Sequence, residues 1–302
     1  MRIVVALGGN ALLQRGEALT AENQARNIAV AATALVPLFE AGHEIILTHG
    51  NGPQVGLLAI QSASTPETPT ALDVLDAESA GMIGYLLAQG LRNALPAGRT
   101  IATLLSEVRV DSADPAFVHP TKPIGRVFTE IEASALAAER GWHVAQDGKT
   151  WRRVVASPKP LEILGLEAIR TLIDHQITVI CLGGGGIPVV RDPEGKMHGI
   201  EAVIDKDHAS ALLARDLKAD WLLMLTDVEA IYTGWGTDHA EAIRETTPEA
   251  LAALSFPAGS MGPKVAAAVA FVSHTAGRAG IGRMQDASAI LAGTAGSRIA
   301  VR

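Results

Sequence analysis

Ile3-Val4-Val5-Ala6-Leu7-Gly8-Gly9, at the start of the chain, joins a short apolar segment to two glycines. The same succession, an apolar run and then glycines, recurs at residues 44–56 and 178–186. Longer segments with helical periodicity separate these runs, which is typical of βαβ units. The sequence therefore predicts an α/β fold with a mainly parallel sheet that is covered by helices on both faces.

The alternation predicts the positions of individual elements. We expect strands at Ile3–Leu7, Glu44–Thr48, Thr100–Leu105, Thr178–Leu182, Trp221–Leu225 and Arg298–Val301. We expect helices at Ala21–Ala41, Leu72–Leu95, Leu166–His175, Lys206–Leu217, Pro248–Leu254 and Lys264–Ala276.

Residues 115–160 interrupt this alternation. They contain five prolines, a short helical stretch at Glu130–Arg140, and a segment at Trp142–Val155 whose Asp147-Gly148 pair is typical of a hairpin turn. We expect a small protruding subdomain or lid here, within a single domain that spans residues 1–302. The alternative is an ordinary long surface insertion.

Composition excludes several classes of protein. The chain has 25 Lys and Arg against 32 Asp and Glu, a net charge of -7, which argues against a nucleic-acid binder with a broad basic surface. Only 7 of the basic residues are lysines, so the positive partners of an anionic ligand must be local. The single Cys181 lies in an apolar run and fits a buried thiol in a reducing, cytoplasmic setting. No apolar run is long enough to predict a membrane span.

The glycine-rich segments predict a phosphate-binding site. Gly8-Gly9, Gly50-Asn51-Gly52 and Gly183–Gly186 each follow a predicted strand, and ligands of open parallel sheets bind at the carboxyl ends of strands. Glycine lets backbone amides surround phosphate oxygens. For any one of these segments a tight turn is the better explanation, but three at equivalent strand ends favour a ligand.

Two known phosphate fingerprints are absent. The first strand is followed by Gly8-Gly9-Asn10, without the three spaced glycines of a dinucleotide-binding turn. Gly148-Lys149-Thr150 resembles the end of a Walker loop, but His143 stands where the leading glycine belongs. We therefore interpret the triplet as a hairpin turn.

Three lysines stand in unusual contexts. Lys122 lies between prolines in Pro120-Thr121-Lys122-Pro123, Lys206 lies between two aspartates at a predicted helix start, and Lys264 follows Gly262-Pro263. Ammonium groups there would stabilise charge on a transferring phosphoryl group, with Asp207 orienting them. The alternative is that Asp205-Lys206-Asp207 caps a helix and that Lys264 is a surface lysine.

Eight short stretches recur together in one family. They are residues 6–12 (ALGGNAL), 48–56 (THGNGPQVG), 120–125 (PTKPIG), 151–155 (WRRVV), 183–188 (GGGGIP), 201–207 (EAVIDKD), 225–228 (LTDV) and 259–264 (GSMGPK). Their joint order and spacing are specific, although each stretch is short. Over essentially its whole length the chain resembles the carbamate kinases of the amino acid kinase family.

The resemblance implies an open three-layer αβα sandwich. A lobe at about 1–200 would bind carbamate or carbamoyl phosphate, and a lobe at about 201–302 would bind ATP or ADP. The implied reaction is reversible phosphoryl transfer between ATP and carbamate, commonly run toward ATP in this family, with Mg²⁺ held mainly by the nucleotide phosphates, in a homodimer. Because the attacking oxygen of carbamate is already anionic, such a reaction needs positioning and charge neutralisation but no general base.

The resemblance also implies roles for individual residues. Lys206 and Lys264 would flank the migrating phosphoryl group, Asp207 would hold both lysines, and Lys122 would reach in from the subdomain. The residues implied in the acyl-phosphate site are Gly8, Gly9, Asn10, Gly50, Asn51 and Gly52. Those implied in the nucleotide pocket are Thr226, Asp227, Tyr232 and Met261.

One departure from the wider family narrows the choice of substrate. Most amino acid kinases have a lysine where this chain has Ala6, and in carbamate kinases a lysine at the position of Lys122 replaces it. Two alternatives stay open: another small-acid kinase of this family, and a non-catalytic nucleotide-binding or regulatory protein of the same fold. Ala6 argues against the first alternative, and the three lysines argue against the second.

Overall fold

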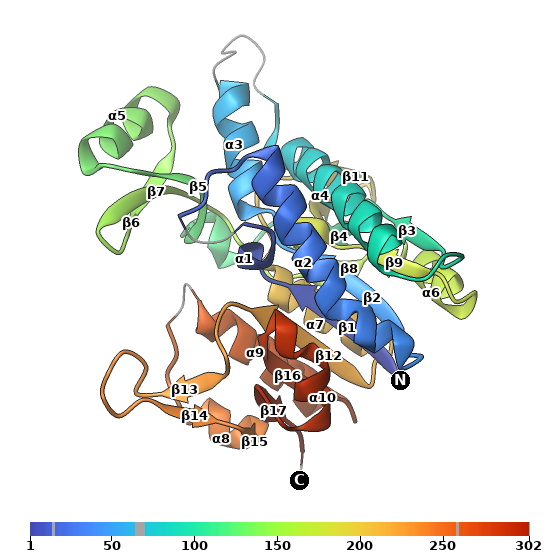
Figure 1. Ribbon diagram of the computed structural model, residues 1–302. Coiled ribbons are helices and arrows are strands. Elements are labelled where there is room, and N and C mark those ends of the chain that lie inside the picture. The colour runs from blue at the N-terminus through green and yellow to red at the C-terminus, as the bar shows by residue number, and fades with distance from the viewer. Residues whose placement is uncertain (14–15, 64–69, 258–259, 302) are drawn as a thin grey trace.

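A central eight-stranded sheet organises the molecule (Figure 1). The computed structural model describes residues 1–13, 16–63, 70–257 and 260–301, except the side chains of Asn10 and Ala11. In spatial order the strands are β15 (Glu245–Thr246), β17 (Ser297–Ile299), β16 (Arg278–Arg283), β12 (Trp221–Thr226), β1 (Arg2–Leu7), β2 (Glu44–His49), β9 (Thr178–Ile180) and β3 (Ile101–Thr103). All neighbouring pairs are parallel except β16 and β17, so the predicted mainly parallel sheet is confirmed.

Helices cover both faces of this sheet. Alternate residues of β1 point to opposite sides, so that Ile3 and Val5 belong to one apolar cluster and Val4 and Ala6 to another. The first cluster packs under α2 (Ala21–Glu40), α4 (Leu72–Ala94) and α10 (Ala287–Ala292). The second packs under α6 (Leu166–Asp174), α7 (Lys206–Asp216) and α9 (Met261–His274). The result is a three-layer αβα sandwich.

The predicted strands and helices are present, and nearly all of their ends agree within two residues. The exception is α9, which begins at Met261 instead of Lys264. Pro263 is its third residue, and proline is tolerated in the first turn of a helix because the amide groups there have no partner within the helix. The loop expected before Lys264 is therefore the first turn of the helix.

Several elements were not predicted. The longest are α3 (Gly52–Ala63), β16 and α10. The others in the described part of the body are α1 (Gly9–Leu12), β15, the paired strands β13 (Ile231–Thr233) and β14 (Glu241–Ile243), and the strands β11 (Met197–Gly199), β10 (Ile187–Arg191), β4 (Glu107–Arg109) and β8 (Glu162–Ile163) of a second sheet. The helix α8 (Pro248–Ala252) was predicted. The described residues also form 3₁₀ turns at Pro115–Phe117, Gly183–Gly185 and Met284–Asp286.

Residues 122–155 form a small unit with its own sheet. Its strands are β5 (Lys122–Phe128), β7 (Thr150–Val155) and β6 (His143–Asp147), and α5 (Glu130–Arg140) lies against them. Figure 1 shows these elements extending to one side of the central sheet. The β6–β7 hairpin pairs Asp147 with Thr150 around Gly148, at φ 64°, which confirms the predicted turn. We call residues 122–155 the subdomain.

Two glycines bring the subdomain close to the body of the molecule. A Cβ atom on Gly56 of α3 would lie 1.9 Å from the Cα of Gly125 in β5. Only a glycine allows this approach, because real Cβ atoms never come so near another backbone. Arg153 Nη2 also lies 4.0 Å from Glu201 Oε2, and the amide of Val203 donates to the carbonyl of Ala156 at 2.9 Å. The subdomain is thus joined to the body through Gly125 and Arg153, and the residue that follows it, Ala156, is bonded to the body as well.

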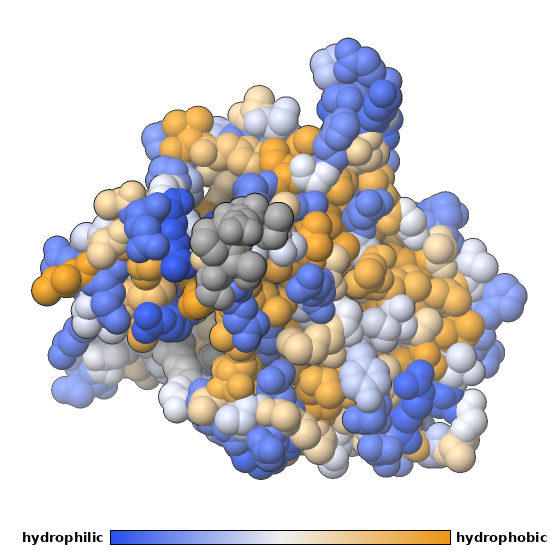
Figure 2. All heavy atoms as spheres, turned by 90° about the horizontal axis from the view of Figure 1, so that it is seen from above, coloured by the Kyte–Doolittle hydropathy of each residue, from blue (hydrophilic) through white to orange (hydrophobic). Residues whose placement is uncertain are grey.

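One face of the molecule is mixed in character. On the face in Figure 2, hydrophilic and hydrophobic residues lie interspersed. Within the described ranges, no helix is both long enough and apolar enough to cross a membrane.

Candidate functional site

Two glycine segments meet where β1 and β2 end. The amide of Gly8 donates to the carbonyl of Leu225 at 2.9 Å, and the amide of Gly50 donates to that of Leu7 at 3.2 Å. A Cβ on Gly50 would lie 3.3 Å from the nitrogen of Gly9 and 3.7 Å from Cδ of Lys206. These contacts place the carboxyl ends of three neighbouring strands, β12, β1 and β2, beside the start of α7.

Two of the glycines leave room that the protein itself does not use. A Cβ on Gly9 or Gly52 would meet no heavy atom within 4 Å. Neither residue has a positive φ, so neither packing nor backbone conformation among the described residues requires glycine there. The open space beside these two glycines would allow a ligand to approach the backbone closely.

Asp207 joins two of the three predicted lysines. Its Oδ1 accepts from Lys206 Nζ at 2.5 Å and its Oδ2 accepts from Lys264 Nζ at 3.2 Å. The side chains are nearly buried, with exposed fractions of 5% for Asp207, 10% for Lys206 and 15% for Lys264. Since Lys206 begins α7 and Lys264 lies in the first turn of α9, the positive ends of two helix dipoles meet at the same place.

The charges in this group depend on one another. Burial alone would raise the pKa of Asp207, but the ammonium groups of Lys206 and Lys264 outweigh it and lower that pKa. Burial lowers the pKa of Lys206, and Asp207 only partly opposes the change. The carboxylate is therefore held ionised, and both lysines are oriented by one buried anion.

Lys122 reaches the same region from the subdomain. Its Nζ donates to Oδ2 of Asp205 at 2.5 Å, and Asp205 immediately precedes Lys206. Burial would raise the pKa of Asp205, but the charge of Lys122 outweighs it and holds that pKa well below the ordinary value. The three lysines are thus assembled around two carboxylates, Asp205 and Asp207, that are separated in sequence by Lys206 alone.

The side chain of Asn51 has a structural role in the segment Gly50-Asn51-Gly52. Its side chain is buried and donates to Asp76 Oδ1 at 3.0 Å and to Ser79 Oγ at 2.9 Å, both on α4. A Cβ on Gly184 would overlap with the same Asn51 side chain. Asn51 therefore anchors the glycine segment to α4.

The implied nucleotide residues lie in the second half of the chain. Thr226 ends β12, with its Cα 3.7 Å from the Cβ position of Gly8, and its hydroxyl donates to Asp227 at 3.1 Å. Tyr232 lies on β13, outside the central sheet, where its ring is 5.2 Å from that of the exposed Trp235. Met261 is the first residue of α9 and is partly buried.

Sequence reasoning missed three residues of this site. Asp205 was interpreted only as a helix cap, and Asp76 and Ser79 lie inside a helix without any local signal. One predicted residue cannot be placed fully, because the side chain of Asn10 lies outside the described part, although its backbone belongs to α1. Gly259, the first residue of the family stretch 259–264, also lies outside the described part.

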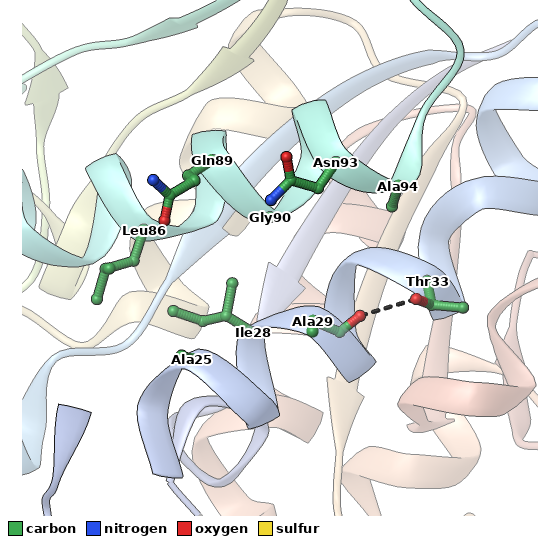
Figure 3. A pocket seen from close by; sticks show the side chains of 9 residues that line it. All are labelled: Ala25, Ile28, Ala29, Thr33, Leu86, Gln89, Gly90, Asn93 and Ala94. Atoms are coloured by element: carbon green, nitrogen blue, oxygen red, sulfur yellow. Dashed lines mark hydrogen bonds between the residues drawn. The ribbon is translucent and has the colours of Figure 1, made fainter. Parts of the chain in front are cut away.

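Neither a metal-binding cluster nor the cavity between α2 and α4 indicates another phosphate site among the described residues. In the described part of the chain, no cluster of three His, Cys, Asp or Glu residues is arranged to bind a metal. A cavity of about 290 Å³ lies between α2 and α4 (Figure 3). Its lining residues are Ala25, Ile28, Ala29, Thr33, Leu86, Gln89, Gly90, Asn93 and Ala94. Because that lining carries no ionisable side chain, it offers no charge to a phosphate.

Known proteins resemble this chain over its full length. The family model described as amino acid kinase family matches residues 1–281. The carbamate kinase of Rhizobium meliloti is 54% identical over 302 residues, covering 99% of this chain and 93% of the relative. The carbamate kinase of Escherichia coli strain K12 is 51% identical over 300 residues, covering 99% of each.

Solved structures agree with these relatives. Carbamate kinase from Giardia lamblia bound to citric acid superposes with a TM-score of 0.93 at 40% identity, covering 99% of this chain and 98% of the other. The same enzyme bound to AMP-PNP gives a TM-score of 0.89 at 39% identity with the same coverage. The chain belongs to the amino acid kinase family and, within it, to the carbamate kinases.

Proposed function

We propose that this protein catalyses the reversible transfer of a phosphoryl group between ATP and carbamate, giving ADP and carbamoyl phosphate. The observation that carries this proposal is the buried group of Lys206, Asp207 and Lys264 beside the glycine ends of β1 and β2. Phosphoryl transfer spreads negative charge over the migrating group, and enzymes catalyse it by positioning and charge stabilisation. Buried ammonium groups beside backbone amides supply both.

In this proposal the glycine segments bind the acyl-phosphate side. The open space at Gly9 and Gly52 lets phosphate oxygens approach the backbone, and Asn51 fixes the segment by its bonds to α4. The remaining members of the proposed site are Gly8, Asn10 and Gly50. In the forward direction an anionic oxygen of carbamate attacks the γ-phosphorus of ATP and the bond to the β-γ bridging oxygen breaks, so no proton has to be removed.

The lysines neutralise the transferring group from the nucleotide side. Asp207 keeps two ammonium groups within 3.2 Å of its own oxygens, which holds like charges together without the substrate. Preorganised charges of this kind cost no reorganisation at the moment of reaction. Lys122 adds a third positive charge from the subdomain.

We propose that Mg²⁺ enters with the nucleotide. Asp205 and Asp207 are the carboxylates within the lysine group, and both accept hydrogen bonds from lysines. Their oxygens are thereby engaged, which leaves the nucleotide phosphates as the main ligands and fits the chemistry of Mg²⁺. When bound, the ion supplies further charge neutralisation, while Thr226, Asp227, Tyr232 and Met261 form the nucleotide pocket.

We also propose a homodimer. α4 exposes three large apolar side chains, Val74, Met82 and Tyr85, at spacings that place them along one side of a helix. A second copy of this chain would cover them. A mass of one chain, about 31.4 kDa, in multi-angle light scattering at micromolar concentration would contradict the dimer.

A coupled assay tests the reaction. Purified protein with ADP, Mg²⁺ and carbamoyl phosphate should form ATP, detected by luciferase, and EDTA should stop its formation. ATP formation no faster than in enzyme-free buffer would refute the proposal. A panel of amino acids and small carboxylic acids with ATP, read by ADP release, separates carbamate from the substrates of other small-acid kinases. Nucleotide binding without turnover would instead indicate a regulatory protein.

Replacing Lys206 tests the role of the buried charge. Lys206→Ala should lower kcat by roughly two to three orders of magnitude, the size expected for loss of a group that stabilises charge in the transition state. Lys196→Ala is the matched control, because Lys196 is exposed in the turn between β10 and β11 and should retain normal kcat. Similar rates for both variants would return Lys206 to a purely structural role.

A further inference from the structure

Asp205 uses its two carboxylate oxygens for different partners. Oδ1 accepts from the amides of Asp207 at 2.9 Å and His208 at 3.4 Å, which caps the N-terminus of α7. Oδ2 accepts from Lys122 Nζ at 2.5 Å. One side chain therefore joins the helix that begins with Lys206 to the lysine that the subdomain contributes.

The subdomain presents Lys122 as the first residue of β5. Pro123 follows it and restricts the backbone, so the position of the ammonium group depends on the long side chain and on its partner. The side chain of Lys122 is 31% exposed, more than those of Lys206 and Lys264, and Asp205 is only 14% exposed. A partly exposed cation is thus held by a more deeply buried anion.

The distribution of charge explains why a second carboxylate is needed. Asp207 already accepts from Lys206 and Lys264, one lysine on each oxygen. A third ammonium group brought to the same helix start would be repelled by these two unless it had an anion of its own. Asp205 supplies that anion at the position next to Lys206.

We propose that Asp205 is a positioning residue for phosphoryl transfer, which holds Lys122 of the subdomain at the start of α7, beside Lys206. This inference rests on the proposed function and adds a residue to the same site. Asp205 acts through Lys122 and through the helix start, and it does not itself contact the phosphoryl group. Its effect is on the rate of transfer once both substrates are bound, and not on nucleotide affinity.

The competing explanation is that Asp205 only caps α7. Asparagine is as good an N-cap as aspartate, so Asp205→Asn keeps the cap and removes the charge that holds Lys122. Asp205→Ala removes both. The pair of variants therefore separates the cap from the ion pair.

The experiment measures kcat, the KM for ADP and carbamoyl phosphate, and Tm for a double-mutant cycle. Asp205→Asn should lower kcat by about tenfold or more, within the range of couplings in a shared ion-pair network, with Tm and the KM for ADP near wild-type values. In a Lys122→Ala background the same change should have almost no further effect on kcat. Asp205→Ala should in addition lower Tm. Asp114→Asn is the control, because Asp114 caps the 3₁₀ turn at Pro115–Phe117 through Ala116, outside the lysine group, and should keep normal kcat.

Each outcome decides between the explanations. Normal kcat in Asp205→Asn, or an equal loss with and without Lys122, would overturn the inference and leave Asp205 as a cap. Normal kcat in Lys122→Ala would overturn it as well, since the residue that Asp205 positions would then be dispensable. A wild-type enzyme without turnover would refute the proposed function itself, which the variants alone would not do.

Discussion

Acid should destabilise this protein through a single buried histidine. His49 is the last residue of β2, is 1% exposed, and lies so close to Gly183 that a Cβ there would be 2.7 Å from its Cε1. Its Nδ1 lies 3.2 Å from the carbonyl oxygen of Gly50. Because a carbonyl oxygen can only accept a hydrogen bond, Nδ1 carries a hydrogen and is the donor. The ring is therefore packed beside the glycine segment of the proposed phosphate site.

The pKa of His49 decides the sign and the size of the effect. This pKa is lowered from 6.5 to about 4, chiefly by burial and also by the charge of Lys206, although the hydrogen bond to Gly50 opposes the change. Because the unfolded chain binds a proton more readily between these values, stability is complete above pH 6.5 and is lost as the pH falls toward 4. The full effect is about 3 kcal/mol, of which roughly 2 kcal/mol is lost between pH 7 and pH 5.

Denaturant unfolding of wild type and His49→Gln at pH 7, 6 and 5 measures this effect. The variant should be less stable at pH 7, because it loses packing, but its free energy of unfolding should fall by about 2 kcal/mol less than that of wild type by pH 5. His239→Gln, at an exposed position, should follow wild type. Parallel pH profiles for wild type and His49→Gln would refute the reasoning. If the variant does not fold, NMR of the His49 ring decides the matter, and protonation near pH 6.5 would contradict it.

Two further substitutions or modifications are expected to have clear outcomes. Gly56→Ala should destabilise the protein by about 1–3 kcal/mol and speed proteolysis in the subdomain, because the new Cβ would overlap with Gly125. Gly81→Ala is the control: its new Cβ would lie 3.9 Å from Leu105, so this variant should be neutral or stabilising. Equal Tm values for the two variants would contradict this expectation. Cys181 is buried, and burial raises the pKa of its thiol to about 12, so a thiol-alkylating reagent should leave the native protein unmodified and active; rapid labelling in mass spectrometry would be the contrary result.

Strands with unbroken apolar runs could be predicted from the sequence, whereas β16 could not. Gly280 and Gly282 interrupt the apolar pattern of β16, and glycine is disfavoured in strands. Both glycines are required by a helix from elsewhere in the chain, because a Cβ at either position would approach the Ile290 side chain of α10 within 2.7 Å. A tertiary contact thus decides the residue type, and local preference cannot indicate it.

The helix α3 was missed for a related reason. Its first turn contains Gly52 and Pro53, and Gly56 follows, so its helix propensity is low. Gly56 is explained by the approach of Gly125 from the subdomain, and Gly52 by the open space at the proposed phosphate site. The glycines that weaken the helical pattern are therefore explained by the structure around the helix, and not by the helix itself.

The chemistry of the site could be predicted further than its geometry. Lysines are scarce in this chain, so their contexts were informative, and glycines at strand ends follow a general rule of parallel sheets. The carboxylate partner of Lys122 lies 83 residues away, and that of Asn51 lies inside α4, 25 residues away. Pairings at these separations depend on how the elements pack, which no local pattern contains.

The segment Asp205-Lys206-Asp207 illustrates this limit most directly. By composition it is one charged cluster, and a helix cap explains it adequately. The backbone, however, is extended at Asp205, with φ -71° and ψ 120°, and becomes helical at Lys206. The two carboxylates therefore serve different partners: Asp205 receives Lys122 from the subdomain, while Asp207 receives Lys264 from α9. Because both carboxylates depend on the same helix start, a change in where α7 begins would move the partners of all three lysines, so the arrangement of the lysines depends on this one capped turn.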